Sequence, residues 1–214
     1  FDAAGTSLYW WNAVPNSPAL TSSTTFSNNT WYHIAFVRSS STLTLYVNGV
    51  SDATGSYSVN LNASTNFLIA QDPQLSAGRT FNGYISNFRV VKGTAVYTSA
   101  FTPPTSPLAA IANTQLLTCQ SYNFLDNSTN AYTITKNGSP QIQGFVPFVP
   151  NSSYSTYGSG YFDGSTMSLT VASNSAFSLT GDFTIEAWVY LTSASGTKTI
   201  FTNRTNYNNS TGLA

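Results

Sequence analysis

Alternation of side-chain type with a period of two residues is the feature that most limits the folds open to this 214-residue chain. Between residues 183 and 191, Phe, Ile, Ala, Val and Leu occupy the odd positions, while Thr, Glu, Trp and Tyr occupy the even ones. Because successive side chains of a strand point to opposite faces, this segment is predicted to be a strand with one buried face. No long segment of the sequence shows the i, i+3, i+4, i+7 apolar spacing of an amphipathic helix.

Turn-forming residues divide the rest of the chain into further short strands. Gly, Asn, Ser and Pro separate the apolar segments, and the pair Asn48–Gly49 suits a two-residue hairpin turn. The further predicted strands are residues 31–37, 43–47, 66–70, 84–91, 131–136 and 167–171. Residues 101–107 hold three prolines, so they are predicted to form an extended connector rather than an interior strand. The whole pattern predicts an all-β fold, an antiparallel jelly-roll β-sandwich.

The charge of the chain excludes several classes of partner. Charged residues make up 7% of the sequence, and seven basic side chains balance seven acidic ones. Nucleic-acid binding requires clustered Lys and Arg, as does attraction to an anionic membrane surface, and the sequence has no basic run. No apolar stretch approaches the roughly 18 residues that a membrane-spanning helix requires. We therefore expect no nucleic-acid partner and no membrane insertion.

Several motifs together are specific enough to indicate a family. Two lie in the second half, GYFDGSTMSL at residues 160–169 and GDFTIEAWV at residues 181–189. Three lie in the first half: TWYHIAFVR at 30–38, LYVNG at 45–49 and FNGYISNFRV at 81–90. These segments resemble the opening, middle and closing strands of laminin G-like, concanavalin A-like jelly rolls. The following segment, VKGTAVYTSAFTPP at 91–104, is similar to a variant found in phage and marine-virus tail or fibre proteins.

The order of these motifs is unusual for the family. Residues 1–110 resemble the closing half of one sandwich, and residues 111–214 resemble the opening half of the next one or of the same one. The chain is therefore a register-shifted unit of a tandem array, a circularly permuted single domain, or a subunit that shares half-sandwiches with its neighbours. In all three arrangements each half needs a complement, because a half alone would expose a sheet edge and an apolar face.

Residues suited to catalysis are scarce in the sequence. Many sandwich relatives cleave glycans with paired carboxylates, but Glu186 is the single glutamate and its neighbours Ile185 and Ala187 break that pattern. The single histidine, His33, lies in a predicted strand, where a packed and hydrogen-bonded role is expected. Cys119 has no histidine near it in sequence that would activate the thiol. These observations predict a protein that is not an enzyme.

One position is a candidate calcium ligand. Many laminin G-like domains hold calcium with carboxylate and carbonyl oxygens, and hard cations prefer several oxygen ligands. Asp72, together with carbonyl groups around Gly78, is the position that the resemblance implies. The alternative for Asp72 is a turn residue whose carboxylate bonds to its own loop. No other cofactor is expected.

Aromatic and amide side chains supply the candidate ligand-binding residues. In the segment Tyr9-Trp10-Trp11, successive rings point to opposite faces, so one tryptophan is expected in the core while the other is open to a sugar ring or a partner. A polar loop near the end of the chain adds Arg204, Asn206 and Tyr207 to the predicted glycan-binding residues. The alternative for both segments is ordinary packing and an ordinary polar loop.

The sequence therefore predicts a noncatalytic module for adhesion or display. We expect it on an extracellular, cell-surface or virion-surface protein, as part of a tandem-repeat fibre. Its predicted partners are a cell-surface or environmental glycan and neighbouring copies of the same domain. The alternative is a structural filament subunit, in which half-sandwiches complement one another head to tail.

Overall fold

The computed structural model of the chain describes residues 1–2, 4–12, 17–61, 65–72, 79–148, 157–193 and 195–203. Within these ranges the chain is built of antiparallel strands, with one short 3-10 helix, η2 (Ser175–Phe177). The described residues include no helix that is long and apolar enough to cross a membrane. The predicted all-β, antiparallel sandwich is confirmed.

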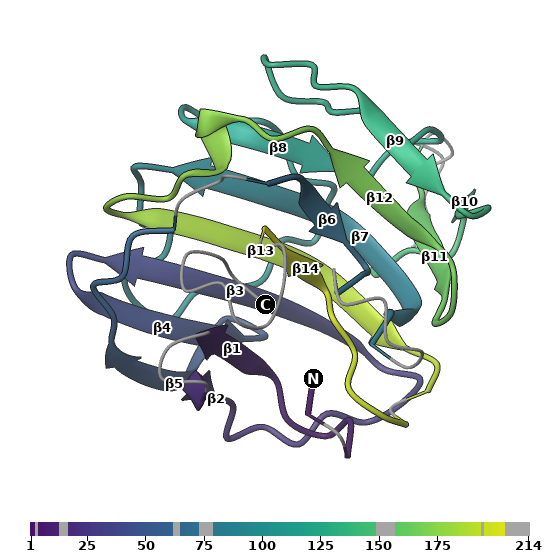
Figure 1. Cartoon of the computed structure of the whole chain (residues 1–214). Helices are drawn as coiled ribbons and strands as arrows, with labels where there is room; N and C mark the ends of the chain where they lie inside the picture. Colours follow the sequence, from purple (N-terminus) through teal and green to yellow (C-terminus); the bar gives the residue numbers. More distant parts are fainter. Residues whose placement is uncertain are drawn as a thin grey trace.

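The larger sheet has eight strands and forms one layer of the sandwich (Figure 1). Along the sheet its strands follow the order β10 (Gln141–Gln143), β11 (Ser159–Asp163), β7 (Asn82–Lys92), β13 (Phe183–Leu191), β3 (Trp31–Ser39), β4 (Thr42–Val47) and β5 (Val50–Ser56). The eighth strand, β8 (Thr114–Thr118), pairs with β7 alongside β11.

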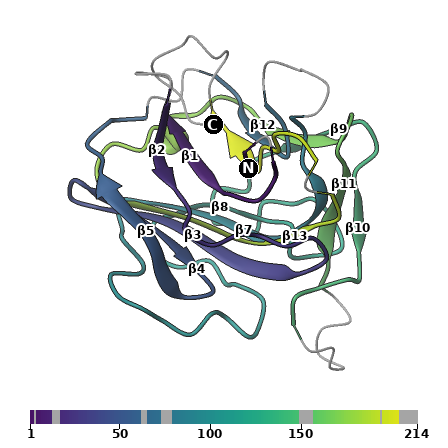
Figure 2. The ribbon, with the colours of Figure 1, turned by 90° about the horizontal axis from the view of Figure 1, so that it is seen from below.

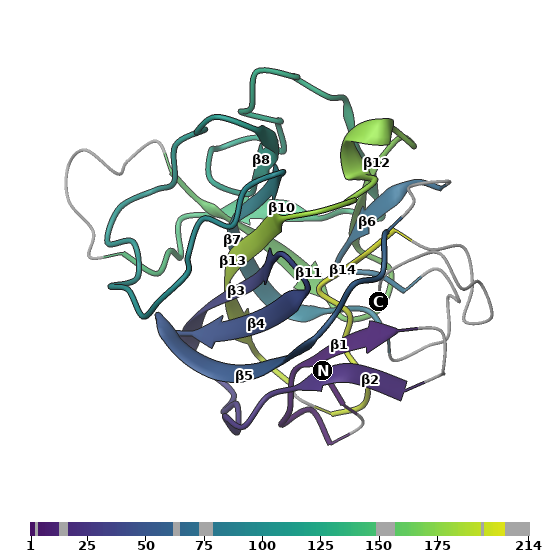
Figure 3. The same cartoon turned by 90° about the vertical axis from the view of Figure 1, so that its left-hand side faces the viewer.

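Two smaller sheets form the facing layer. One has the order β14 (Phe201–Thr202), β6 (Phe67–Ile69), β12 (Ser168–Val171) and β9 (Ile134–Asn137). The other is the pair β1 (Tyr9–Asn12) and β2 (Ser17–Thr21). Seen from the side, β1 and β2 lie in the same layer as β14 and β6 (Figure 3).

Strands from the two halves of the sequence alternate in this sandwich. Strand β13, from the second half, lies between β3 and β7, which both come from the first half (Figure 1). In the facing layer β6, from the first half, lies between β12 and β14. The two halves therefore build one shared core within a single chain.

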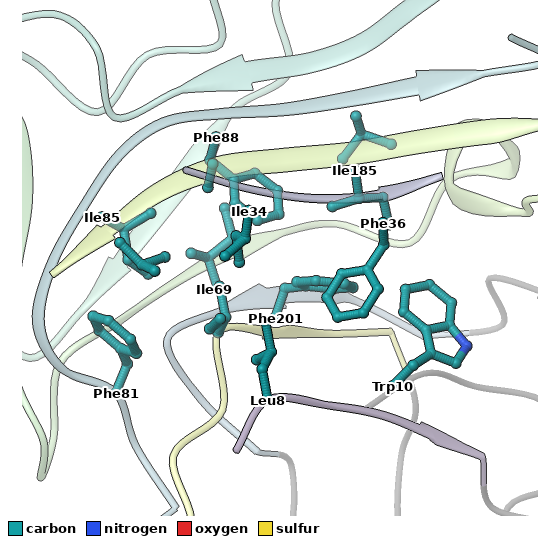
Figure 4. Close-up of a cluster of buried hydrophobic side chains, with 14 of the residues drawn as sticks. Leu8, Trp10, Ile34, Phe36, Ile69, Phe81, Ile85, Phe88, Ile185 and Phe201 are labelled. Atoms are coloured by element: carbon teal, nitrogen blue, oxygen red, sulfur yellow. The ribbon is translucent and has the colours of Figure 1, made fainter. Parts of the chain in front are cut away.

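The core fills the space between the two layers. Every odd-numbered residue of β13 belongs to it, as the alternation at 183–191 predicts. Figure 4 shows the side chains of Ile185, Phe36, Ile34, Ile85 and Phe88 converging from the larger sheet on those of Ile69 and Phe201 from the smaller one. Burial of these apolar side chains is the main favourable contribution to folding.

Strand β5 is an element that the hydrophobic pattern does not reveal. Its sequence, VSDATGS, is polar, and its residues are exposed or half-buried because it lies at the edge of the sheet. The turn before it is as predicted: Asn48 and Gly49 both have positive φ, 49° and 79°. This left-handed geometry is the one that a tight hairpin requires at both central positions.

A bulge in β7 determines which side chains of that strand reach the core. The register between β7 and β13 shifts between Glu186 and Trp188, opposite Asn87, whose φ is 55°. The extra residue allows Phe88 to enter the core, while Arg89 faces Glu186 on the other side of the sheet.

Part of the outer face of the larger sheet, around Glu186, is covered by a long loop between β7 and β8, residues 93–113, which we call the strap. In Figure 2 the strap passes below the sheet, on the side opposite β1 and β12. Its two ends meet, because the amide of Lys92 donates a hydrogen bond of 3.1 Å to the carbonyl of Asn113. Residues 101–107 form no strand within it, as expected from their prolines.

Aromatic stacking and one tight contact hold the strap against the sheet. The rings of Tyr97 and Phe101 stack at 3.6 Å, and Phe101 also packs against Tyr46 of β4. The amide of Phe101 donates to the carbonyl of Gly49 at 2.9 Å. A Cβ on Gly49 would lie 1.8 Å from the Phe101 carbonyl oxygen, so this contact requires glycine.

The shared core leads to a prediction about assembly. We expect the isolated 214-residue chain to be a monomer of 22.9 kDa, because β13 finds both of its partners within the same chain. Light scattering across a dilution series measures this. A mass that grows with concentration would contradict the prediction and would favour half-sandwiches shared between chains.

Candidate functional site

A pocket opens in the smaller layer, between β1 and β14. Its volume is about 190 Å³. Tyr9 and Trp11 of β1 form one wall, and residues 197–201, which lead into β14, form another. Asp72 and Arg79 complete the rim. Ligand sites in proteins are typically concave, with apolar walls and a few polar groups, so this pocket is the leading candidate for a binding site.

Strand alternation turns two aromatic rings of β1 toward the pocket. Tyr9 and Trp11 stand two residues apart on the same face, and their ring centroids are 6.3 Å apart. Both side chains are half-buried and line the pocket. Trp11, one of the two predicted ligand-binding tryptophans, therefore lies at the wall of a pocket that a ligand can enter.

Trp10 points the other way, into the core. It is 1% exposed, stacks on Phe183 at 5.5 Å and contacts Phe36 and Tyr57 at 5.0 and 5.8 Å. These contacts leave no ring face for a sugar. The prediction that Trp10 binds a ligand is therefore wrong, because the side chain lies on the core face of β1.

The floor of the pocket belongs to the core of the sandwich. Leu8, Phe36 and Phe201 are each at most 5% exposed and line the pocket from below. Figure 4 shows these three side chains lying close together, Phe36 from the larger sheet and Phe201 from β14. The pocket thus combines an apolar floor with a polar rim.

The charges of the rim cancel. Asp2 and Asp72 are acidic, whereas Arg79 and Lys198 are basic. One Asp2 oxygen accepts hydrogen bonds from the amides of Thr6 and Ser7 at 2.8 and 3.2 Å. Burial lowers the pKa of Lys198 below its ordinary value, since the ammonium is partly removed from water. A rim without net charge suits an uncharged polar ligand.

Asp72, the candidate calcium ligand, lies in this rim beside a cation. It is 3% exposed, and its Oδ2 accepts a hydrogen bond of 3.3 Å from Nη1 of Arg79. Across the described ranges no group of three or more His, Cys, Asp or Glu side chains is arranged to hold a metal ion. The carbonyl groups predicted to help, around Gly78, lie outside the described residues. Calcium binding at Asp72 stays a prediction.

The remaining predicted ligand-binding residues are Arg204, Asn206 and Tyr207. They lie outside the described residues. Their roles stay predictions.

A second polar cluster is buried under the strap. Both oxygens of Glu186 are engaged: Oε1 accepts hydrogen bonds from Nε and Nη2 of Arg89 at 2.8 and 2.6 Å. Oε2 accepts one from the Tyr97 hydroxyl at 2.8 Å and lies 3.2 Å from Nε2 of His33. Glu186 is 1% exposed and His33 is fully buried.

This environment keeps Glu186 ionised. Burial alone would raise the pKa of its carboxyl group, but the hydrogen bond with His33 and the positive charge of Arg89 outweigh it. The pKa is therefore lower than the ordinary value. Because Tyr97 belongs to the strap and Arg89 to β7, the carboxylate ties the strap to the sheet. The expected structural role of Glu186 agrees with this geometry.

Sequence reasoning missed several residues of the pocket. Arg79 and Lys198 are far from Trp11 in sequence, and nothing local in the sequence links them. Tyr9 could have been predicted, because it stands two residues from Trp11 and so shares its face. The structure brings two predicted residues, Trp11 and Asp72, to one pocket, although the sequence predicts a sugar for one and calcium for the other.

Comparison with known protein families adds one match. Residues 1–103 match the Laminin_G_3 family, described as the concanavalin A-like lectin/glucanases superfamily. This segment runs from the start of the chain through β1 to β7 and into the strap. No curated protein and no solved structure matches the chain.

The buried cluster generates a stability prediction. Glu186→Ala should lower the free energy of unfolding by about 3–5 kcal/mol, because it leaves the Arg89 charge buried without its carboxylate. Urea denaturation at neutral pH measures the loss. Glu186→Gln keeps the shape of the side chain, so it should lower the free energy of unfolding less than Glu186→Ala does. Equal stabilities for Glu186→Ala and the unaltered chain would contradict the structural role.

The same carboxylate predicts a pH dependence. Its pKa is lowered in the folded state, so its contribution to stability is present above the unfolded value of about 4.3 and is lost as the pH falls through the folded value. The stability difference between the unaltered chain and Glu186→Gln should therefore shrink as the pH drops below about 4.3. Thermal unfolding over a pH series tests this, and a difference that does not change with pH would refute it.

Proposed function

Because residues 1–103 match the concanavalin A-like lectin/glucanase superfamily, we propose that the chain is a noncatalytic carbohydrate-binding module. The proposed binding site is the pocket between β1 and β14. The observation that carries the proposal is the pair of rings, Tyr9 and Trp11, at the wall of a pocket whose rim charges cancel.

The chemistry of the pocket suits a sugar ring. The C–H face of a pyranose packs on an aromatic face, and Tyr9 and Trp11 supply two such rings. Sugar hydroxyls both donate and accept hydrogen bonds, and the rim provides a hydroxyl at Thr199 as well as charged donors and acceptors. The apolar floor would take the less polar side of the ligand.

The geometry supports binding without cleavage. Glycoside hydrolysis ordinarily uses two carboxyl groups, one of which protonates the leaving group. Glu186 is sealed under the strap, on the opposite side of the larger sheet from the pocket. At the pocket, Asp72 is paired with Arg79 and Asp2 already accepts two backbone hydrogen bonds.

We further propose that the module acts on an extracellular, cell-surface or virion-surface protein, next to further copies of itself. Its surface is polar through hydroxyl and amide groups rather than charges, since 7% of residues are charged. Such a surface keeps its contacts in saline surroundings, where exposed ion pairs are screened.

A second candidate function is a filament subunit that shares strands with its neighbours. Its basis is that β13 pairs with β3 and β7, two strands from the other half of the sequence, although here the pairing is made within one chain. The same pairing made between chains would give a head-to-tail assembly. Light scattering across a dilution series separates this function from the carbohydrate-binding one.

Trp11→Ala tests the proposed site. A glycan array followed by calorimetry on the strongest hit should show at least about tenfold weaker binding, because the stacking surface is lost. The matched control is Tyr122→Ala, which removes a side chain that is 57% exposed and lies beside β10, away from the pocket. Unchanged affinity in a folded Trp11→Ala protein would overturn the assignment of the pocket.

A further inference from the structure

Four aromatic side chains form a row across the outer face of the larger sheet. They come from four neighbouring strands and stand directly opposite one another in register: Tyr161 (β11), Tyr84 (β7), Tyr190 (β13) and Trp31 (β3). Successive ring centroids are 5.2, 5.8 and 5.4 Å apart. We call this set the aromatic row.

The alternation of each strand keeps the aromatic row out of the core. Tyr190 shares a face with Glu186, whereas its neighbour Val189 is buried in the core. Tyr84 likewise alternates with the core residue Ile85. All four rings are half-buried, and their spacing follows from the distance of about 4.8 Å between neighbouring strands.

A fifth ring lies against the aromatic row. Phe145, in the segment after β10, has its ring centroid 4.8 Å from Tyr190, 4.9 Å from Tyr84 and 5.4 Å from Trp31. The hydroxyl of Ser159 donates a hydrogen bond to the carbonyl of Phe145 and helps to fix this segment. Phe145 is nevertheless 41% exposed. Core packing does not account for an exposed phenylalanine on a row of three tyrosines and a tryptophan.

We propose that the aromatic row and Phe145 form a second carbohydrate-contact surface, which binds an uncharged, extended saccharide chain lying across the strands. None of its five side chains is charged, so the surface fits a ligand without charge. Three of them carry phenol hydroxyls, which donate and accept hydrogen bonds as sugar hydroxyls do. The rings offer faces for the C–H groups of successive sugars.

The electrostatics of Tyr84 agree with this picture. Burial raises the pKa of Tyr84, and the neighbouring phenol groups of Tyr161 and Tyr190 raise it further. The phenol groups of Tyr161 and Tyr190 therefore lie close to that of Tyr84. A saccharide chain that crosses the row would meet a series of neutral hydroxyl groups.

The sheet around the aromatic row argues against a peptide strand as the ligand. Tyr161, Tyr84 and Tyr190 are each paired with a strand on both sides, so the row offers no continuous strand edge for an added strand. A proline-rich peptide docks on aromatic grooves without strand pairing, and its binding is one outcome of the test.

The two proposed surfaces face different ways. The pocket lies in the layer of β1 and β14, whereas the aromatic row is on the far side of the larger sheet, the side that Figure 2 shows below β3 and β13. They can therefore be altered separately. A module with both could hold two saccharide chains at once.

The test uses the full chain and neutral oligomers of glucose, xylose and N-acetylglucosamine, with affinity measured by calorimetry. The double variant Tyr84→Ala/Tyr190→Ala should weaken binding at least about tenfold, because it removes the two central rings. The matched control, Tyr84→Phe/Tyr190→Phe, keeps the packing and removes the hydroxyls. It should fold normally and bind several-fold more weakly, which a purely structural cluster would not do.

Phe145→Ala gives an independent variant if the alanine pair does not fold, since Phe145 is partly exposed. Phe145→Ala should lower the affinity for the same oligomers. Trp11→Ala should leave the binding of these oligomers to the aromatic row unchanged. If Trp11→Ala abolishes saccharide binding and the variants of the aromatic row do not change it, this inference is overturned. The proposal for the pocket would then stand. Selective binding of a proline-rich peptide or of acidic saccharides at the row would also overturn it. Binding of no saccharide by the chain would overturn both proposals.

Discussion

The pairing of β13 with β3 on one side and β7 on the other is the constraint on which the rest of the structure depends. One face of β13 fills the core with residues such as Ile185, while the other face carries Glu186 and Tyr190. Since both of its edges are used, β13 joins the two halves of the sequence by main-chain hydrogen bonds as well as by apolar packing. The pocket floor and the aromatic row both depend on that junction, because it sets the register of the larger sheet.

A buried carboxylate beside this junction has to be paired, because an isolated charge in the interior is very costly. The bulge at Asn87 provides a partner for this charge, because it places Arg89 on the same face of the sheet as Glu186. Tyr97 then adds a hydrogen bond from the strap. The same network that satisfies the charge therefore also holds the strap over this part of the outer face, and a structural demand explains why an acid, a histidine and an arginine meet there.

Much of the fold follows from local pattern, because alternation within a strand needs no knowledge of its partners. The burial of Phe183 to Leu191 and the Asn48–Gly49 turn are examples. The surfaces depend instead on register between distant segments: Arg89 and Glu186 are 97 residues apart, and no local pattern indicates the bulge that brings them together. For this reason the sequence does not predict the aromatic row. Each of its residues is common in strands, and only the register between the strands shows that they are neighbours. For Trp10 and Trp11, alternation indicated that one ring is buried but not which.

The closed ends of the strap have a consequence for how such a domain can diversify. Lys92 and Asn113 are hydrogen-bonded neighbours, so the sheet would keep its connectivity whatever length of chain ran between them. The entropic cost of lengthening such a loop grows slowly with its length. The position between Lys92 and Asn113 is therefore suited to insertions. One covering segment can be exchanged for another there, which changes the surface of the outer face and leaves the sandwich unchanged.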